Sequence, residues 1–116
     1  MDKHMYPEAS IELHRQRTAL APEPAAAFKA FSNAVFADGA LSAKMKDLIA
    51  IAVAHTTQCP YCIRGHTASA LRRGATQQEV MEAIWVAAEM RAGAAYAHSN
   101  LALDTMNQVE AKKAAG

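Results

Sequence analysis

The chain is short of cysteine, of aromatic residues and of net charge. It has two cysteines and one tryptophan among 116 residues, and 12 basic side chains nearly balance 11 acidic ones. The cations are scattered, whereas nucleic-acid binders usually present a basic stripe, so we expect no nucleic-acid partner. No apolar run reaches the length of a membrane span. The N-terminal run Met1–His4 lacks the apolar segment of a signal peptide, so we expect a cytoplasmic protein without membrane contact.

Helix-forming residues are abundant. Hydrophobic residues make up 52% of the chain, alanine occurs 28 times, and no stretch alternates apolar and polar residues as a half-buried strand would. The length bounds the chain to one domain, so residues 1–116 are predicted to form a single all-α domain. About six helices are expected, at residues 11–20, 25–37, 42–56, 59–73, from 76 to about 90, and 94–109.

Local signals support several of these boundaries. Ser42 is a good N-cap, and Thr76 with Glu79 has the spacing of a capping box. The run Arg91-Ala92-Gly93 is expected to interrupt the fifth helix. Arg72 and Arg73, near the end of the fourth helix, are expected on a solvated face.

Both cysteines lie in the stretch Cys59-Pro60-Tyr61-Cys62-Ile63-Arg64-Gly65-His66. Proline favours a helix start, which would make Cys59 the N-cap, and the helix dipole there stabilises a thiolate. On an ideal helix Cys59, Cys62 and His66 lie within roughly 60° of one another around the axis. Because disulfides are rarely structural in the cytoplasm, a C-x-x-C pair indicates redox or metal chemistry. We interpret the stretch as a redox-active dithiol with a histidine close enough to move its proton.

The stretch has three other possible interpretations. A zinc site could use both cysteines, His66, and either His55 or His98, but one helix face gives a poor tetrahedral spread of ligands. A c-type haem is excluded because Ile63, not histidine, follows the second cysteine. The string C-P-Y-C also resembles a glutaredoxin active site, but that fold needs a βαβ pattern, and here a long helix precedes the motif.

The run from Asp47 to Ala54, followed by the C-x-x-C pair and His66, resembles the AhpD-like alkylhydroperoxidase core of the carboxymuconolactone decarboxylase family. The family pattern is an acidic residue, eleven others, then C-x-x-C-x-x-x-H, and the spacing from Asp47 to His66 matches it. The downstream runs 74–76 and 92–95 fit as well, so the resemblance covers roughly residues 25–105. It implies an all-helical fold, usually assembled as a homotrimer or homohexamer.

The resemblance also implies an activity and roles for residues. It implies reduction of (alkyl)hydroperoxides by the Cys59–Cys62 dithiol, with a proton relay through His66 and Asp47 and a lipoyl-type or thioredoxin-type dithiol as reductant. The family's acidic residue is usually glutamate, so the shorter Asp47 would leave a gap for a water. His55 could share that role. The alternative for Asp47 is an exposed charge near a helix N-terminus, where it favours the dipole.

The order of attack is open to two arguments. The helix dipole favours Cys59 as the nucleophile, whereas the resemblance favours Cys62, with Cys59 resolving, and we take Cys62. The expected enzyme is a thiol-dependent peroxidase or disulfide oxidoreductase that requires no metal or organic cofactor. The alternatives are a non-catalytic zinc-binding or scaffold protein, and a decarboxylase-branch member of the same family, whose chemistry does not need a cysteine pair.

Overall fold

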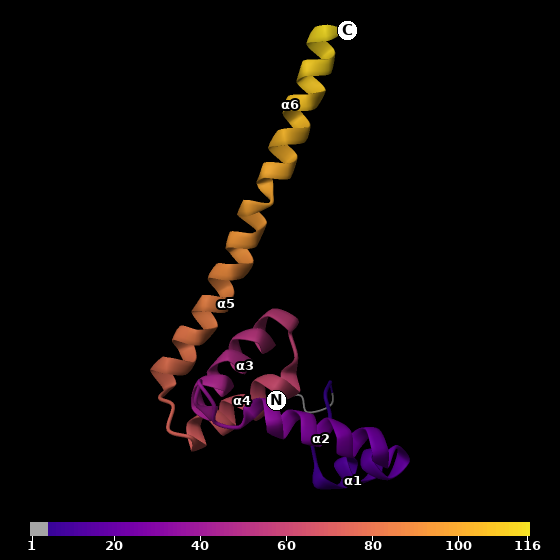
Figure 1. The fold of residues 1–116 in the computed structure, drawn as a ribbon, viewed down its shortest axis with the longest axis vertical. Helices are drawn as coiled ribbons and strands as arrows, with labels where there is room; N and C mark the ends of the chain where they lie inside the picture. The colour runs from indigo at the N-terminus through magenta and orange to yellow at the C-terminus, as the bar shows by residue number, and fades with distance from the viewer. Residues whose placement is uncertain (1–4) are drawn as a thin grey trace.

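A computed structural model describes residues 5–116, and Figure 1 shows that the chain is helical along almost this whole length. Within the described residues there are six helices and no strand, which confirms the predicted all-α fold. The helices are α1 Ile11–Leu20, α2 Pro22–Phe36, α3 Ala43–Thr57, α4 Pro60–Arg72, α5 Gln77–Ala97 and α6 Ser99–Ala115.

The core lies where α3, α4 and the beginning of α5 meet. Leu48 and Ile51 come from α3, Ala70 from α4, Ala75 from the turn before α5 and Val80 from the first turn of α5, and all five are buried. The predicted capping box at Thr76 and Glu79 is present. Ala75 precedes this cap and Val80 follows it, so they occupy the positions of a hydrophobic staple and tie the entry of α5 to the core. These contacts hold α3 and α4 side by side, and the two helices carry the candidate site.

The expected interruption at residues 91–93 is wrong, because α5 continues through Gly93 to Ala97. A glycine inside a helix costs only about 1 kcal/mol relative to alanine, and the neighbouring alanines offset it. The break falls instead at His98, which is the C-cap of α5 and the N-cap of α6 and keeps helical dihedral angles. In consequence α5 and α6 form one long rod that projects away from the other helices (Figure 1). The other predicted start that shifts is that of α2, which begins at Pro22 rather than Ala25, since proline suits the first helical position.

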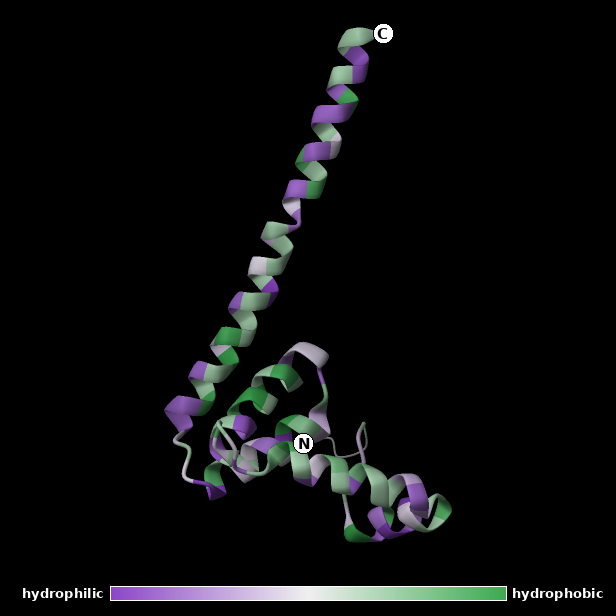
Figure 2. Cartoon of the chain, viewed as in Figure 1, coloured by the Kyte–Doolittle hydropathy of each residue, from purple (hydrophilic) through white to green (hydrophobic). Residues whose placement is uncertain are grey.

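Apolar side chains outside the core remain exposed in the single chain. The radius of gyration is 21.1 Å, against roughly 13 Å for a compact domain of this length. Figure 2 shows hydrophobic residues along the rod interleaved with hydrophilic ones. Large exposed apolar side chains of the rod are Met81, Trp85, Val86, Met90, Tyr96, Leu101, Leu103, Met106 and Val109. None of the helices between residues 5 and 116 combines the length and the apolarity needed to cross a lipid bilayer.

Candidate active site

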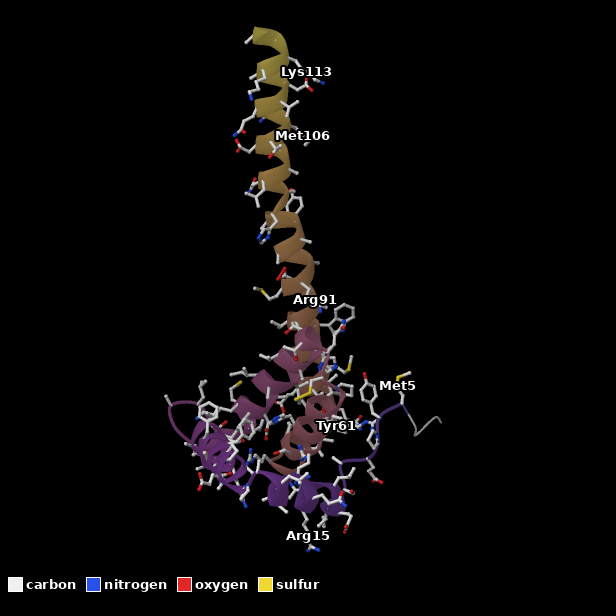
Figure 3. All side chains as sticks on the ribbon, turned by 90° about the vertical axis from the view of Figure 1, so that its right-hand side faces the viewer. Met5, Arg15, Tyr61, Arg91, Met106 and Lys113 are labelled. Carbon is white, nitrogen blue, oxygen red and sulfur yellow. A yellow bond between two sulfur atoms is a disulfide. The ribbon has the colours of Figure 1, made fainter. Side chains whose placement is uncertain are left out.

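The dithiol lies at the junction of α3 and α4. Helix α3 ends at Thr57, its C-cap Gln58 turns the chain with a positive φ of 58°, and α4 begins at Pro60. Cys59 is the N-cap of α4, as predicted, and its sulfur accepts a hydrogen bond from the Cys62 N–H at 3.3 Å. The two cysteines are joined in a disulfide, with their Cα atoms 5.3 Å apart. Figure 3 shows this bond in yellow near the labelled Tyr61.

Asp47 is the one buried charged residue of residues 5–116, with 1% of its surface exposed. Oδ1 accepts a hydrogen bond from His66 Nδ1 at 3.0 Å, and Oδ2 accepts from Ser69 Oγ at 2.7 Å and from an Arg73 guanidinium N–H at 2.8 Å. Burial alone would raise the pKa of the Asp47 carboxyl, but the three hydrogen bonds and the Arg73 charge outweigh it and lower this pKa. Asp47 is therefore ionised at neutral pH, and it is not the exposed charge of the alternative interpretation.

The contact between Asp47 and His66 defines the state of the imidazole ring. A carboxylate can only accept hydrogen bonds, so Nδ1 of His66 carries the proton and donates it to Oδ1. In the neutral ring Nε2 is then left as an acceptor. The Phe36 ring stacks on the His66 ring with centroids 4.8 Å apart and planes 25° apart. The gap expected from the shorter aspartate is absent, because α3 and α4 pack closely enough for a direct 3.0 Å hydrogen bond.

A groove of about 410 Å³ opens beside Cys62 and His66, and both residues line it. Its other walls are formed mainly by apolar side chains of α2 and α3, and Lys46 also borders it. They include Ile49 and Val53 of α3, which are about half exposed along this wall. A small apolar molecule can thus reach Cys62 from the side on which His66 lies.

The structure brings together four of the five predicted site residues and separates the fifth. His55 donates from Nδ1 to the Ile51 carbonyl of its own helix at 2.7 Å, and it lines a different pocket, together with Pro60, Ile63 and Arg64. It makes no hydrogen bond to Asp47 or His66. His98, offered as a zinc ligand, bonds to the Ala94 carbonyl far along the rod. Residues 5–116 contain no group of three or more histidine, cysteine, aspartate or glutamate side chains arranged to hold a metal ion.

Ser69, Arg73 and Phe36 were not identified from the sequence. Arg73 was expected on a solvated face, but its guanidinium reaches inward to Asp47 while 42% of the side chain stays exposed. A signal was available for two of them, since His66, Ser69 and Arg73 repeat at i, i+3 and i+7 and so share one face of a helix. No local pattern identifies Phe36, which comes from a different helix.

The N-terminal segment contacts the dithiol helix. The Tyr61 hydroxyl donates to the Pro7 carbonyl at 2.7 Å, and the Tyr6 and Tyr61 rings meet edge to face with centroids 6.0 Å apart. Tyr61 lies between the two cysteines in the sequence and is labelled in Figure 3. These contacts anchor residues 6 and 7 next to the disulfide.

Together, the helical fold and a disulfide at a helix N-terminus beside a carboxylate–histidine pair define an all-α dithiol protein. The model of the carboxymuconolactone decarboxylase family matches residues 22–105. The chain belongs to this family, and its core is AhpD-like.

Individual proteins agree with this assignment. An uncharacterised Paracoccus denitrificans protein, "protein 4 in cox locus", is 63% identical over 84 residues, which are 72% of this chain and 76% of that protein. A crystal structure from Methanobacterium thermoautotrophicum has a TM-score of 0.67 and 38% identity, covering 72% of this chain and 93% of that one. A Thermotoga maritima protein of the family, described with a possible involvement in the antioxidative response, has a TM-score of 0.53 and 25% identity, covering 77% and 92%.

Proposed function

We propose that the protein is a thiol-dependent peroxidase that reduces organic hydroperoxides through the Cys59–Cys62 dithiol. The observation that carries the proposal is that Cys62 and His66 share one apolar groove while His66 is bonded to the buried Asp47. The description of the Thermotoga maritima relative points in the same direction. The disulfide of the structure corresponds to the oxidised state of the cycle.

In the reduced enzyme, His66 Nε2 accepts the proton of the Cys62 thiol, and the thiolate attacks the terminal oxygen of the hydroperoxide. The O–O bond breaks, Cys62 becomes a sulfenic acid, and the alkoxide leaves as an alcohol after it takes the proton from His66. The Cys59 thiol then attacks the sulfenic sulfur, releases water and closes the disulfide. An external dithiol, of lipoyl or thioredoxin type, restores both thiols by exchange and supplies the two electrons that reduced the peroxide.

Exposure supports Cys62 as the attacking residue. Cys62 is exposed and lines the groove, whereas Cys59 is half buried and is absent from the groove wall. The N-cap position still favours a thiolate at Cys59 through the helix dipole. We assign the attack to Cys62 because it combines access for the peroxide with a histidine base in the same groove.

The proposal is tested with reduced, chelator-treated protein and a stoichiometric amount of cumene hydroperoxide. We expect the loss of two thiols per subunit and the formation of one cumyl alcohol, without added metal. Because each buried CH₂ group contributes about 0.8 kcal/mol, cumene hydroperoxide should react roughly tenfold or more faster than hydrogen peroxide. A protein with both cysteines replaced by serine is the control. Thiols that stay intact would overturn the proposal, and zinc that survives gel filtration before the chelator treatment would favour the zinc-binding alternative.

We also propose that the protein is a homo-oligomer, a trimer or a hexamer. Exposed apolar side chains on α2, α5 and α6 exceed what a monomer in water normally shows, and α6 buries none of its residues. Light scattering at micromolar concentration should give a mass several times the 12.4 kDa of one chain. Leu103→Glu places a charge on an apolar position of α6 and should lower this mass. Lys113→Glu, which changes a side chain of the same helix that is already charged, should leave the mass unchanged. A monomeric mass for the unaltered protein contradicts the prediction.

A further inference from the structure

The two oxygens of Asp47 have separate partners. Oδ1 accepts from His66 alone, while Oδ2 accepts from both Ser69 and Arg73. Arg73 is the C-cap residue of α4, whereas Cys59 is its N-cap. The guanidinium therefore approaches Asp47 from the end of α4 opposite to the dithiol. Ser69 and Arg73 thus hold the carboxylate through Oδ2, and Oδ1 is left to bond to the imidazole ring of His66.

We propose that Arg73, with Ser69, is a positioning residue that keeps the Asp47 carboxylate a permanent anion aimed at His66, so that the proton of the reaction stops at His66. This inference rests on the proposed peroxidase function. It gives Asp47 an electrostatic and orienting role in place of that of a proton acceptor. It also gives Arg73, which lies at the opposite end of α4 from Cys59, an indirect part in the reaction.

The charges around Asp47 support this role. An unpaired carboxylate with 1% exposure would be strongly disfavoured, and a guanidinium supplies both a positive charge and directed donors. On α4 the charged or titratable neighbours are His66 and Arg73. On α3, Lys46 borders the groove but donates to the Ala37 carbonyl, and Lys44 pairs with Glu79 of α5 at the surface. Arg73 is thus the permanent cation bonded to Asp47, and the pair is neutral before His66 gains a proton.

The hydrogen bonds of Asp47 explain why the proton stays on the His66 ring. A proton passed from His66 Nδ1 to Oδ1 would only exchange donor and acceptor in that hydrogen bond, and a proton on Oδ2 would face the donors of Ser69 and Arg73. Either position replaces the charge-assisted hydrogen bond between the Arg73 guanidinium and a carboxylate by a weaker one to a neutral carboxyl. Retaining the anion also stabilises the imidazolium formed when Nε2 takes the thiol proton. Arg73 and Ser69 therefore favour a carboxylate at every step.

The test uses the full chain labelled with ¹³C at aspartate Cγ and ¹⁵N at histidine, in Arg73→Met, Arg73→Lys and Arg72→Met proteins. Arg72 is the matched control, an exposed arginine next in sequence whose side chain makes no hydrogen bond or ion pair within residues 5–116. In Arg73→Met the titration midpoint of the Asp47 carboxyl should rise by about one pH unit, the low end of the range for a neighbouring cation, since Arg73 is partly solvated. The midpoint in Arg73→Lys should lie between those of Arg73→Met and the unaltered protein. The midpoint in Arg72→Met should equal that of the unaltered protein.

The ¹⁵N shifts report which ring nitrogen of His66 carries the proton. We expect Nδ1–H in the unaltered protein and a mixture of tautomers in Arg73→Met. For cumene hydroperoxide, kcat should fall about tenfold in Arg73→Met with little change in KM, and Arg73→Lys should recover part of it.

The inference is overturned if Arg73→Met changes neither the titration of Asp47 nor the tautomer of His66. It is also overturned if the titration of Asp47 shifts in Arg73→Met but kcat stays the same. A third outcome separates the two proposals. If the unaltered protein consumes no hydroperoxide, but Arg73→Met shifts the Asp47 titration and the His66 tautomer as expected, the peroxidase function is wrong and the positioning of Asp47 by Arg73 is confirmed.

Discussion

Replacing either Cys59 or Cys62 by serine is expected to abolish multiple-turnover reduction of organic hydroperoxide. Residues 5–116 contain no other cysteine, so neither variant can close a disulfide within the subunit. Without the disulfide the oxidised protein offers no bond for the external dithiol to exchange with in the proposed way. The measurement is steady-state peroxide consumption with excess dithiol, compared with the unaltered protein. Ala68→Ser is a matched control, because it adds an exposed hydroxyl to α4 and leaves both thiols in place.

The same two variants distinguish the attacking cysteine from the resolving one. After a single addition of hydroperoxide, a sulfenic-acid probe should label the Cys59→Ser protein, in which Cys62 remains beside the groove and His66. The Cys62→Ser protein should stay unlabelled. Labelling of the Cys62→Ser protein alone would reverse our assignment and favour the helix-dipole argument. Labelling of neither variant would contradict a sulfenic intermediate.

Asp47→Asn is expected to slow peroxide turnover about 100-fold, because the base His66 loses the carboxylate that orients and stabilises it, and general acid–base assistance contributes at least this much. The amide carries no charge to stabilise the protonated His66 ring. Its NH₂ group must also face either the His66 N–H or the donors of Ser69 and Arg73. Leaving a buried donor unsatisfied should lower the free energy of unfolding by about 1–3 kcal/mol. Asp104→Asn, at an exposed position of α6, is the matched control and should change neither quantity.

The pH dependence of stability tests the same residue independently of catalysis. The pKa of Asp47 is lowered in the folded protein, so its contribution is fully present above its ordinary value of 3.8 and is lost as the pH falls through the folded value. The stability difference between the unaltered protein and Asp47→Asn should therefore not decrease from about pH 7 to pH 5 and should shrink below about pH 4. Denaturant unfolding across this range measures it. A difference that disappears near pH 6 would contradict an ionised, stabilised Asp47.

The local features of the chain were readable from the sequence because each depends on residues within one turn of a helix. The capping box at Thr76 and Glu79, the Ser42 cap and the start of α4 at Pro60 are set by hydrogen bonds between neighbours three residues apart. The N-cap position of Cys59 follows from the same short-range rule. The expected break at Gly93 failed because a weak local preference was overridden by the good helix formers on either side.

The sequence by itself determined that the chain is helical, that its two cysteines meet at a helix N-terminus and that His66 lies on the same helix. The tertiary structure alone decided that Asp47 is buried, that Arg73 turns inward to it and that Phe36 covers the His66 ring. The hydrogen bonds from His66, Ser69 and Arg73 to Asp47 span 19, 22 and 26 residues, and they form because α3 and α4 pack side by side. Helical periodicity specifies which residues share a face, but the distance between faces of two helices is set by the side chains packed between them.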